Sequence, residues 1–362
     1  MTMEFGRRLR MKVYGSSHGP EVGVTVDGLP AGTPVEVGMV QAALDRRRPV
    51  GRRLATRRQE EDRLVVDRGL VGGRSDGSTF QAHVANTDTR REPYDQLLDT
   101  PRPGHADYPA RVRYGLDADL SGGGIFSGRM TVGLVIAGVI AQGLLARKGV
   151  EVVAFTRSVG SVDADVPEEI ELGELARRSR SNEVGAPDAG SAERMEQVIS
   201  EARRAGDSVG GIVEVRAAGV PVGLGEPFFD SVESVLAHAY FSVPAVKGVE
   251  FGAGFRAARM RGSEDNDPFV LRDGRIRTTT NHAGGILGGL ATGMPIVARI
   301  SVKPTSSIAL RQRTVNLRTG ESAEIAVTGR HDPCIVPRAV VVLEAVTAFA
   351  LADLAFEGGF LP

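Results

Sequence analysis

Two histidines lie in glycine-flanked loops, where their side chains can exchange protons with a ligand. His18 stands in GSSHG at residues 15–19, and His105 stands in RPGHAD at residues 102–107. Histidine is the side chain whose ordinary pKa is nearest neutrality, so an imidazole held on a loop can donate or accept a proton at cellular pH. Alternatively, each imidazole only hydrogen-bonds its own turn. The occurrence of two such loops among six histidines favours the acid-base role.

A dense group of arginines gives one segment a positive charge, although the formal net charge of the chain is −1. The first three members lie in the last turn of a helix expected over 38–48, where cations stabilise the negative end of the helix dipole. The others follow Pro49 in a loop, where this explanation does not apply. The chain has few lysines, which weakens the argument from any one arginine cluster. The group consists of Arg46, Arg47, Arg48, Arg52, Arg53, Arg57 and Arg58.

Three further segments offer ligand-binding groups. The glycines of NHAGGILGG at 281–289 can bring bare backbone against a flat ligand, although a tight turn between packed elements is an equally good interpretation. KPTSS at 303–307 offers an ammonium and three hydroxyls, and GRHDP at 329–333 offers Arg330 as an anion-binding fork and Asp332 as a base. A solvated turn and a surface ion pair are the alternatives there. Together the loops predict a small, polyanionic substrate.

Composition excludes several classes of protein. The chain has 362 residues, of which 41% are hydrophobic and 25% charged, as expected of a globular protein with one large core or two fused halves. The single Cys334 excludes an internal disulfide and a cysteine zinc cluster, and no other metal-ligand spacing occurs. We therefore predict no metal, a reducing cytoplasm, and neither a nucleic-acid nor a membrane partner. The charged segment 1–10 does not suit a signal peptide, and the apolar stretches 132–145 and 339–356 are either too short for a bilayer or interrupted by charges.

Hydrophobic periodicity predicts the elements that carry these loops. Residues 12–26 form strand structure broken by the 15–19 turn, 212–217 and 296–302 are strands, and 163–190 is a polar surface excursion. Helices are expected at 38–48, at 131–145 after the glycine loop 122–124, and at 195–205, 231–239 and 337–356. The long apolar helices would pack between sheets. We treat 1–362 as a single domain with a weak pseudo-two-fold repeat of halves 1–150 and 206–362.

Ordered motifs run along nearly the whole chain. They are GSSHGP at 15–20, VDGLPAG at 26–32, DRRRP at 45–49, EED at 60–62, NTD at 86–88, RPGHADY at 102–108, PAVKGVE at 244–250, NHAGGILGG at 281–289, KPTSSI at 303–308 and GRHDPC at 329–334. In these motifs the chain resembles the chorismate synthase family.

The resemblance implies an α+β fold, in which central helices lie between antiparallel sheets as a β-α-β sandwich. It implies a cytoplasmic homotetramer that uses reduced FMN, with NADPH or a separate flavin reductase as the source of reducing equivalents. The implied activity is that of a lyase of the shikimate pathway of aromatic amino-acid biosynthesis. It converts 5-enolpyruvylshikimate 3-phosphate to chorismate by an anti-1,4-elimination of phosphate without net redox change.

The resemblance also assigns roles to individual residues. His18 would protonate the departing phosphate, His105 would lie beside the N1 and O2 edge of the flavin, and Asp332 would assist removal of the C6 proton of the substrate. The implied substrate-binding residues are Arg47, Arg53, Arg129 and Arg330. The implied FMN-binding residues are Ser127, Gly128, Ala245, Gly288, Lys303, Pro304, Thr305, Ser306, Ser307 and Arg330.

The chain departs from the family pattern at several positions. Ser16 replaces a glutamate and Val50 a glycine, and IFSGRMT at 125–131 replaces RSSARET. Loss of a cation in a buried site weakens anion binding unless another cation, such as Arg52 or Arg113, replaces it. One alternative is therefore a paralogue that performs the same chemistry on another anionic cyclohexene, with Ile125 and Phe126 forming a more apolar wall. The other alternative is a catalytically silent anion-binding protein, for example one that binds RNA through residues 46–58.

Overall fold

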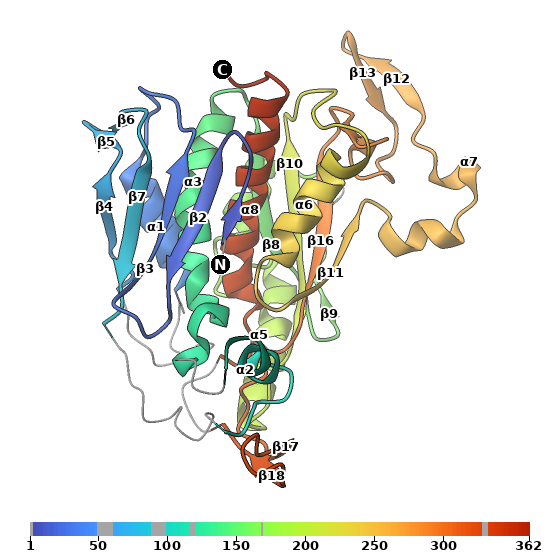
Figure 1. Ribbon diagram of the computed structural model, residues 1–362. Coiled ribbons are helices and arrows are strands. Elements are labelled where there is room, and N and C mark those ends of the chain that lie inside the picture. Colours follow the sequence, from blue (N-terminus) through green and yellow to red (C-terminus); the bar gives the residue numbers. More distant parts are fainter. Residues whose placement is uncertain (1–2, 49–60, 88–98, 116–119, 168, 328–331) are drawn as a thin grey trace.

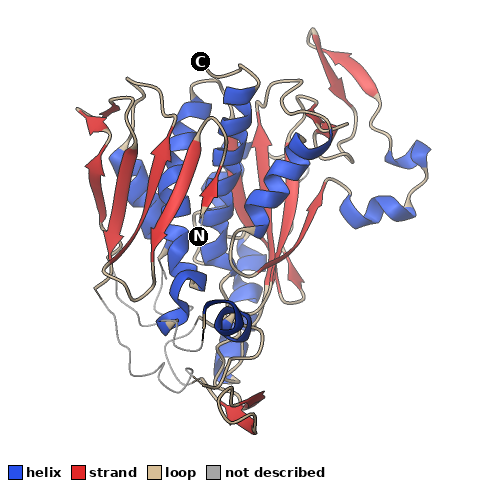
Figure 2. Cartoon of the chain, in the orientation of Figure 1, coloured by secondary structure: helices blue, strands red, loops and turns tan. Residues whose placement is uncertain are grey.

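Two antiparallel sheets enclose a layer of helices. The computed structural model describes residues 3–48, 61–87, 99–115, 120–167, 169–327 and 332–362. Figure 2 shows the helices between the two groups of strands, and Figure 1 shows the order of the elements along the chain. The arrangement confirms the predicted α+β class and the sandwich with central helices.

The first sheet has five strands in the order β1-β2-β3-β7-β4. On β2, Met11 and Val13 are buried whereas Arg10 and Lys12 are exposed, which is the two-residue alternation of a strand with one face on the core. The turn that carries His18 connects β2 to β3, as predicted. The strands are β1 (Glu4–Phe5), β2 (Arg10–Gly15), β3 (Glu21–Asp27), β4 (Leu64–Arg68) and β7 (Phe80–Ala85).

The second sheet has the order β11-β16-β10-β8-β9. Its central strands β10 and β16 pair in antiparallel register from Gly211 opposite Val302 to Ala217 opposite Ile296. The predicted strands 212–217 and 296–302 are confirmed. The strands are β8 (Glu151–Val159), β9 (Val162–Asp163), β10 (Gly211–Ala218), β11 (Val246–Phe251) and β16 (Ile296–Val302).

Helices α3 (Thr131–Ala146) and α8 (Val336–Glu357) form the centre of the helical layer. They approach so closely that a Cβ on Gly138 would lie 2.3 Å from the carbonyl oxygen of Ala345, so only glycine fits there. By length and composition both helices could cross a membrane. They are nevertheless mostly buried inside the protein, which is typical of core helices.

Helices α1 (Val37–Arg47) and α6 (Val232–Phe241) complete the layer, and both were predicted. Two other predictions need correction. The segment 163–190 is not merely a surface excursion, because it contains α4 (Leu172–Ser179), whose Leu175 is fully buried against β8. Helix α5 (Ala189–Arg204) begins before the predicted residue 195, since the Asp188 carboxylate accepts a hydrogen bond from Ser191 N at 2.7 Å and caps the helix there.

An arm projects from the sandwich beside the second sheet (Figure 1). It contains the hairpin β12 (Phe269–Arg272) and β13 (Arg275–Thr278) and the short helix α7 (Gly262–Asp265). The remaining elements are β5 (Leu70–Val71), β6 (Arg74–Ser75), α2 (Asp107–Tyr114), β14 (Ile286–Leu287), β15 (Leu290–Ala291), β17 (Gln312–Val315) and β18 (Ser322–Ile325). The pseudo-two-fold relation between the halves of the chain stays a prediction.

Candidate active site

A cavity of about 750 Å³ lies where α3 and α8 begin. Its walls come from the end of α1, the loop before α2, the turn before α3, the α6–β11 loop and the segment after β16. Thr131 at the start of α3 and Arg338 in the first turn of α8 both line it. Helix N-termini carry a partial positive charge, so the fold itself favours an anion at this place.

Among the described residues that line the cavity, cations far outnumber carboxylates. The carboxylates are Asp62 and Asp332. The cations are Arg47, Arg48, Arg102, Arg129, Lys247, Lys303 and Arg338. A cavity with this imbalance favours a ligand that carries several negative charges.

His105 is held by a carboxylate and an arginine. Its Nδ1 lies 2.5 Å from Oδ1 of Asp107, and Arg102 donates from Nε to Oδ2 of the same carboxylate at 2.7 Å. Burial raises the pKa of Asp107, but hydrogen bonds from Arg102 and His105 outweigh burial and lower this pKa overall. An ionised carboxylate only accepts hydrogen bonds, which favours a proton on Nδ1 of His105. The Nη2 of Arg102 also approaches this ring, at 3.0 Å from Nδ1 and 3.3 Å from Nε2. The Nη1 of Arg102 also donates to Ser307 Oγ at 3.0 Å, which ties this loop to the 303–307 segment.

His18 lies behind the glycine turn of residues 121–126. Gly122 has a φ of +60°, and a Cβ there would lie 1.9 Å from Cε1 of His18. A Cβ on the next residue, Gly123, would lie 3.5 Å from the ring of His105. Gly122 lines the cavity, whereas His18 is not one of the described lining residues. The two imidazoles therefore flank one glycine turn, with His105 on the cavity and His18 behind its wall.

Asp62 joins two of the arginines inside the protein. Its Oδ2 accepts from Arg47 Nη2 at 2.6 Å, and its Oδ1 accepts from Arg129 Nη1. All three side chains are buried, each at most 4% exposed. Burial lowers the pKa of Arg47 to about 10, and Asp62 opposes this shift. Burial raises the pKa of Asp62, but the two guanidinium groups together lower it below its ordinary value.

Asp332 is fixed at the start of α8. Its Oδ2 accepts from Arg338 Nη1 at 2.5 Å, and Arg338 Nε donates to the carbonyl oxygen of Arg47 at 3.1 Å. Thr305 Oγ1 donates to the carbonyl oxygen of Asp332 at 3.2 Å. These contacts place the carboxylate beside both the arginines and the 303–307 segment.

The α6–β11 loop contacts the 303–307 segment directly, and both line the cavity. Ala245 has a φ of +74°, which is rare for a residue with a Cβ, and its carbonyl oxygen accepts from Lys303 N at 3.0 Å. Burial, and secondarily the charge of Lys247, lowers the pKa of Lys303. A bound anion would oppose this shift, because it stabilises the charged ammonium.

The structure brings most of the residues predicted for the site to this cavity. Gly288 is an exception, because it lies exposed in the turn between β14 and β15 and does not line the cavity. Arg53 and Arg330 lie outside the described residues. Those at the cavity are Arg47, His105, Ser127, Gly128, Arg129, Ala245, Lys303, Pro304, Thr305, Ser306, Ser307 and Asp332. Their individual roles stay predictions.

Five charged residues that line the cavity had been assigned no role from the sequence: Arg48, Asp62, Arg102, Lys247 and Arg338. All of them except Arg338 stood in motifs that carried the resemblance. Ile125 and Phe126, at which the chain departs from the family pattern, line the cavity. Arg113, suggested as a replacement cation, does not line it and instead contacts the hydroxyl of Tyr114 at 3.2 Å.

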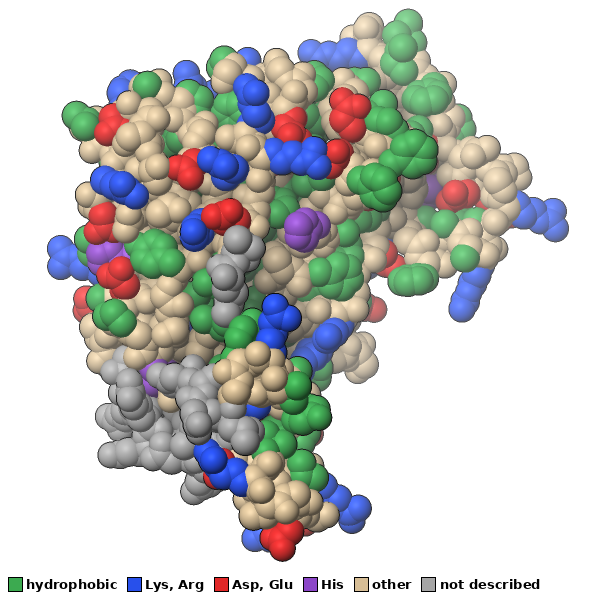
Figure 3. Space-filling view, viewed as in Figure 1, with side chains coloured by type: hydrophobic (Ala, Val, Ile, Leu, Met, Phe, Trp, Pro, Cys, Tyr) green, Lys and Arg blue, Asp and Glu red, His purple; other side chains and the backbone are tan. Residues whose placement is uncertain are grey.

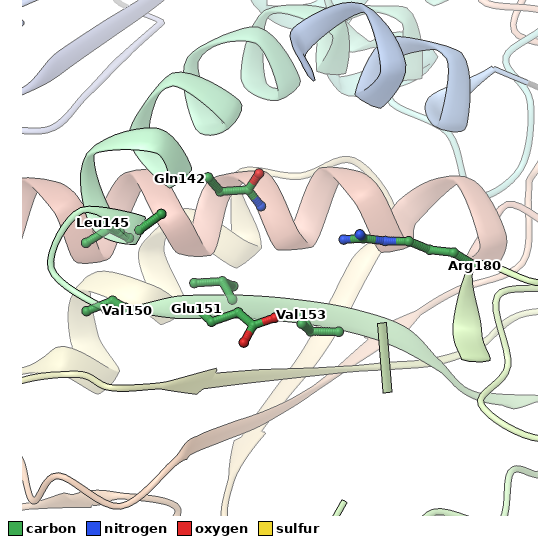
Figure 4. Close-up of a pocket in the computed structure, with 9 residues that line it drawn as sticks. Gln142, Leu145, Val150, Glu151, Val153 and Arg180 are labelled. Atoms are coloured by element: carbon green, nitrogen blue, oxygen red, sulfur yellow. The ribbon is translucent and has the colours of Figure 1, made fainter. Parts of the chain in front are cut away.

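A second cavity of about 400 Å³ opens between the end of α3 and β8 (Figure 4). Its polar lining residues are Gln142, Glu151 and Arg180. Gln142 and Arg180 contact the buried Glu344 of α8, at 3.4 and 3.5 Å. None of the predicted site residues that the structure describes lines this second cavity. Among the described residues, no group of three or more side chains could hold a metal ion.

The geometry defines a class of site: a cationic cavity for a polyanion, equipped with an oriented histidine and a buried carboxylate. A profile of the family described as chorismate synthase matches residues 9–356. A chorismate synthase of Korarchaeum cryptofilum is 49% identical over 349 residues, covering 96% of each chain. One of Methanosarcina mazei is 46% identical over 357 residues, covering 99% of this chain and 97% of the relative.

A crystal structure of chorismate synthase has the same fold, with a TM-score of 0.79 and 27% identity. The match covers 98% of this chain and 93% of the chain in that crystal structure. The chain belongs to the chorismate synthase family and is an enzyme, a lyase, as the sequence predicted. These relatives do not favour the alternatives of a paralogue with another substrate or a silent binding protein.

Proposed function

We propose that this cavity converts 5-enolpyruvylshikimate 3-phosphate to chorismate by anti-1,4-elimination of phosphate, with reduced FMN bound beside the substrate. The observation that carries the proposal is the excess of cations around a cavity that also holds His105 and Asp332. The substrate bears a phosphate and two carboxylates, so its charge suits this lining. A C–O bond to phosphate breaks heterolytically only when the leaving dianion is stabilised, which arginine forks and a histidine acid can do.

The residues present suit a flavin. A volume of about 750 Å³ is within the range of small-molecule sites and leaves room for more than one ligand. Apolar side chains, including Ile125, Phe126 and Val342, offer surface to a planar ring, and Lys303 with its neighbouring hydroxyls offers donors to polar edges. The proposed FMN-binding residues are those that the sequence predicted. Of these, Gly288 does not line the cavity, and Arg330 lies outside the described residues. When bound, reduced FMN supplies electron density that protein side chains lack.

Arg47 and Arg129 are proposed to hold the acidic groups of the substrate, together with Arg53 and Arg330. The Nε of Arg47 is buried and makes no hydrogen bond to any described residue. Buried donors normally have a partner, so this one is available to a ligand. His18 is proposed to protonate the departing phosphate; this requires the phosphate to approach the Gly122 turn.

His105 and Asp332 are proposed to manage the other protons. The Asp107 carboxylate favours the tautomer of His105 with its proton on Nδ1, which leaves the lone pair on Nε2, 3.3 Å from Nη2 of Arg102. Asp332, held by Arg338, is proposed to assist removal of the ring proton of the substrate. Both residues line the same cavity, so both side chains can reach ligands bound there.

We further propose that the enzyme is a cytoplasmic homotetramer. Phe269, Leu271 and Ile276 of the arm are each at least 65% exposed, and apolar side chains gather over that side of the molecule (Figure 3). Exposed apolar surface of this kind marks protein contacts. The buried Cys334 suits a reducing compartment. The flavin is reduced either by NADPH on this enzyme or by a separate reductase.

The test is an anaerobic assay with purified protein, reduced FMN and 5-enolpyruvylshikimate 3-phosphate. We expect chorismate absorbance and free phosphate to appear together, and the rate to fall by roughly 10²-fold or more in His105→Ala. Absence of phosphate release from folded, flavin-loaded protein would overturn the proposed function. A second comparison supplies FMN either reduced or oxidised. If the enzyme needs an added reductase only with oxidised FMN, the reducing equivalents come from that separate reductase.

A further inference from the structure

Asp62 occupies the centre of a continuous hydrogen-bonded network in the cavity wall. On one side, Arg47 donates to Asp62, and the carbonyl oxygen of Arg47 accepts from Arg338, which donates to Asp332. The structure therefore connects Asp62 to a residue proposed for proton removal.

On the other side the network reaches the loop of His18. Arg129 donates to Asp62 from Nη1 and to Asn86 Oδ1 from Nε at 2.9 Å. Asn86 Nδ2 then donates to the carbonyl oxygens of Ser16 and Gly19, at 3.0 and 2.8 Å. These two carbonyls flank His18 in the turn between β2 and β3. Loop geometry at His18 thus depends on where Arg129 is held.

The carboxylate also sets the charge of the wall. Arg47 and Arg129 are both buried, and without Asp62 their like charges would repel each other in a medium of low polarity. With Asp62 in place the three groups carry one net positive charge and a defined geometry. Each guanidinium keeps an orientation fixed before the ligand arrives, which is the condition for strong electrostatic stabilisation of a transition state.

From this network we infer that Asp62 is a positioning residue, which aims Arg47 and Arg129 at the substrate and aligns the His18 loop with Asp332. The inference rests on the proposed function of those residues. Asp62 does not itself react: its side chain is 1% exposed and its oxygens are taken up by the arginines.

The test compares Asp62→Asn with Asp62→Glu. Asparagine keeps the shape of the side chain but removes its charge. Glutamate keeps the charge on a side chain that is one methylene longer. We expect Asp62→Asn to lower kcat at least tenfold per folded molecule, with Asp62→Glu intermediate between it and the wild type. Asp353→Asn is the matched control, because Asp353 is a buried carboxylate that accepts from the backbone of Arg7, Arg8 and Leu9 instead. It should lose stability and keep wild-type kcat and KM.

A purely structural role of Asp62 would lower stability as in the control and leave kcat per folded molecule unchanged, so that result would overturn the inference. If Asp62→Asn fails to fold, Asn86→Ala replaces it. That variant breaks the link to the His18 loop without removing a charge, and an unchanged kcat there would overturn the inference equally.

A binding measurement separates this inference from the proposed function. Titration of flavin-free protein with shikimate 3-phosphate, a cyclohexene phosphate, reports on the arginines without catalysis. Weaker binding in Asp62→Asn supports the role of Asp62 even if the wild type makes no chorismate. Wild-type binding and wild-type kcat in a folded Asp62→Asn would refute that role while leaving the proposed function standing.

Discussion

The Nδ1 atom of His105 lies 2.5 Å from the Oδ1 atom of Asp107. Arg102 donates to the same carboxylate, so the imidazole, the carboxylate and the guanidinium form one cluster on the cavity wall. A carboxylate in this position selects the ring tautomer and fixes the ring plane. The relationship makes the orientation of His105 testable without altering His105.

Asp107→Asn should lower kcat by roughly 10²-fold, because an amide can donate as well as accept and no longer selects the Nδ1 proton. Steady-state kinetics with reduced FMN measures the effect. Asp67→Asn is the matched control, since Asp67 contacts His83 Nδ1 at 2.9 Å on the first sheet, away from the cavity. Equal kcat values for Asp107→Asn and Asp67→Asn would show that the carboxylate does not orient a catalytic histidine.

Gly122→Ala should inactivate the enzyme through His18. The added Cβ would lie 1.9 Å from the imidazole, and the φ of +60° strains any side chain. We expect kcat to fall by roughly 10²-fold or more, as for loss of a general acid.

Gly143→Ala provides the control for this variant. Gly143 lies exposed in α3, with no atom within 4 Å of an added Cβ, so alanine there should raise stability by about 0.5–1 kcal/mol and leave kcat unchanged. Thermal melts measure the stability of both variants, and steady-state kinetics measures their kcat. A folded Gly122→Ala with kcat within twofold of the wild type would remove His18 from the proposed mechanism.

Stability should fall at acid pH through Asp107. The pKa of its carboxyl is lowered from 3.8 in the folded protein, so the unfolded chain binds more protons as the pH falls below about 4. The contribution of the Asp107 carboxyl to the free energy of unfolding is present above about pH 4, and it is lost as the pH falls through the pKa of this carboxyl in the folded protein. Urea unfolding at a series of pH values should show a steeper acid decline for the wild type than for Asp107→Asn. Parallel curves would mean that the carboxyl is not stabilised by its partners.

Assembly should depend on the apolar face of the arm. Leu271 and Ile276 are paired across the β12–β13 hairpin and are 75% and 70% exposed. Replacing both with aspartate should shift the protein to a smaller species in light scattering, because charge is unfavourable at the core of a contact. Arg277→Asp, next to Ile276 but on the opposite face of the strand, should keep the wild-type mass. A wild-type mass for the double variant would exclude the arm from the interface.

The sequence alone was sufficient to predict the elements that have a regular hydrophobic pattern and the site residues that stand in short motifs. The strand 296–302 matched β16, and the long apolar runs 131–145 and 337–356 matched α3 and α8, because burial on all sides leaves an unbroken apolar run. The helix α4 was missed, since its buried Leu172, Leu175 and Ala176 make a short stripe among Glu and Arg.

Contacts between distant segments could not be predicted. Asp62 is 15 residues from Arg47 and 67 from Arg129, and no local pattern reveals that one carboxylate joins both. Arg338 was overlooked because its position in the first turn of α8 places it beside Asp332 only after the helix has formed. The motif at 281–289 is local and clear, yet the fold places its Gly288 in an exposed turn outside the cavity.

The most direct test of the central claim, that one cationic cavity eliminates phosphate with the help of reduced FMN, is the number of turnovers per flavin. With FMN reduced once and oxygen excluded, the account predicts equal amounts of chorismate and phosphate, many for each flavin, with the flavin still reduced at the end. Product limited to one per flavin, or formed equally well without flavin, would contradict it.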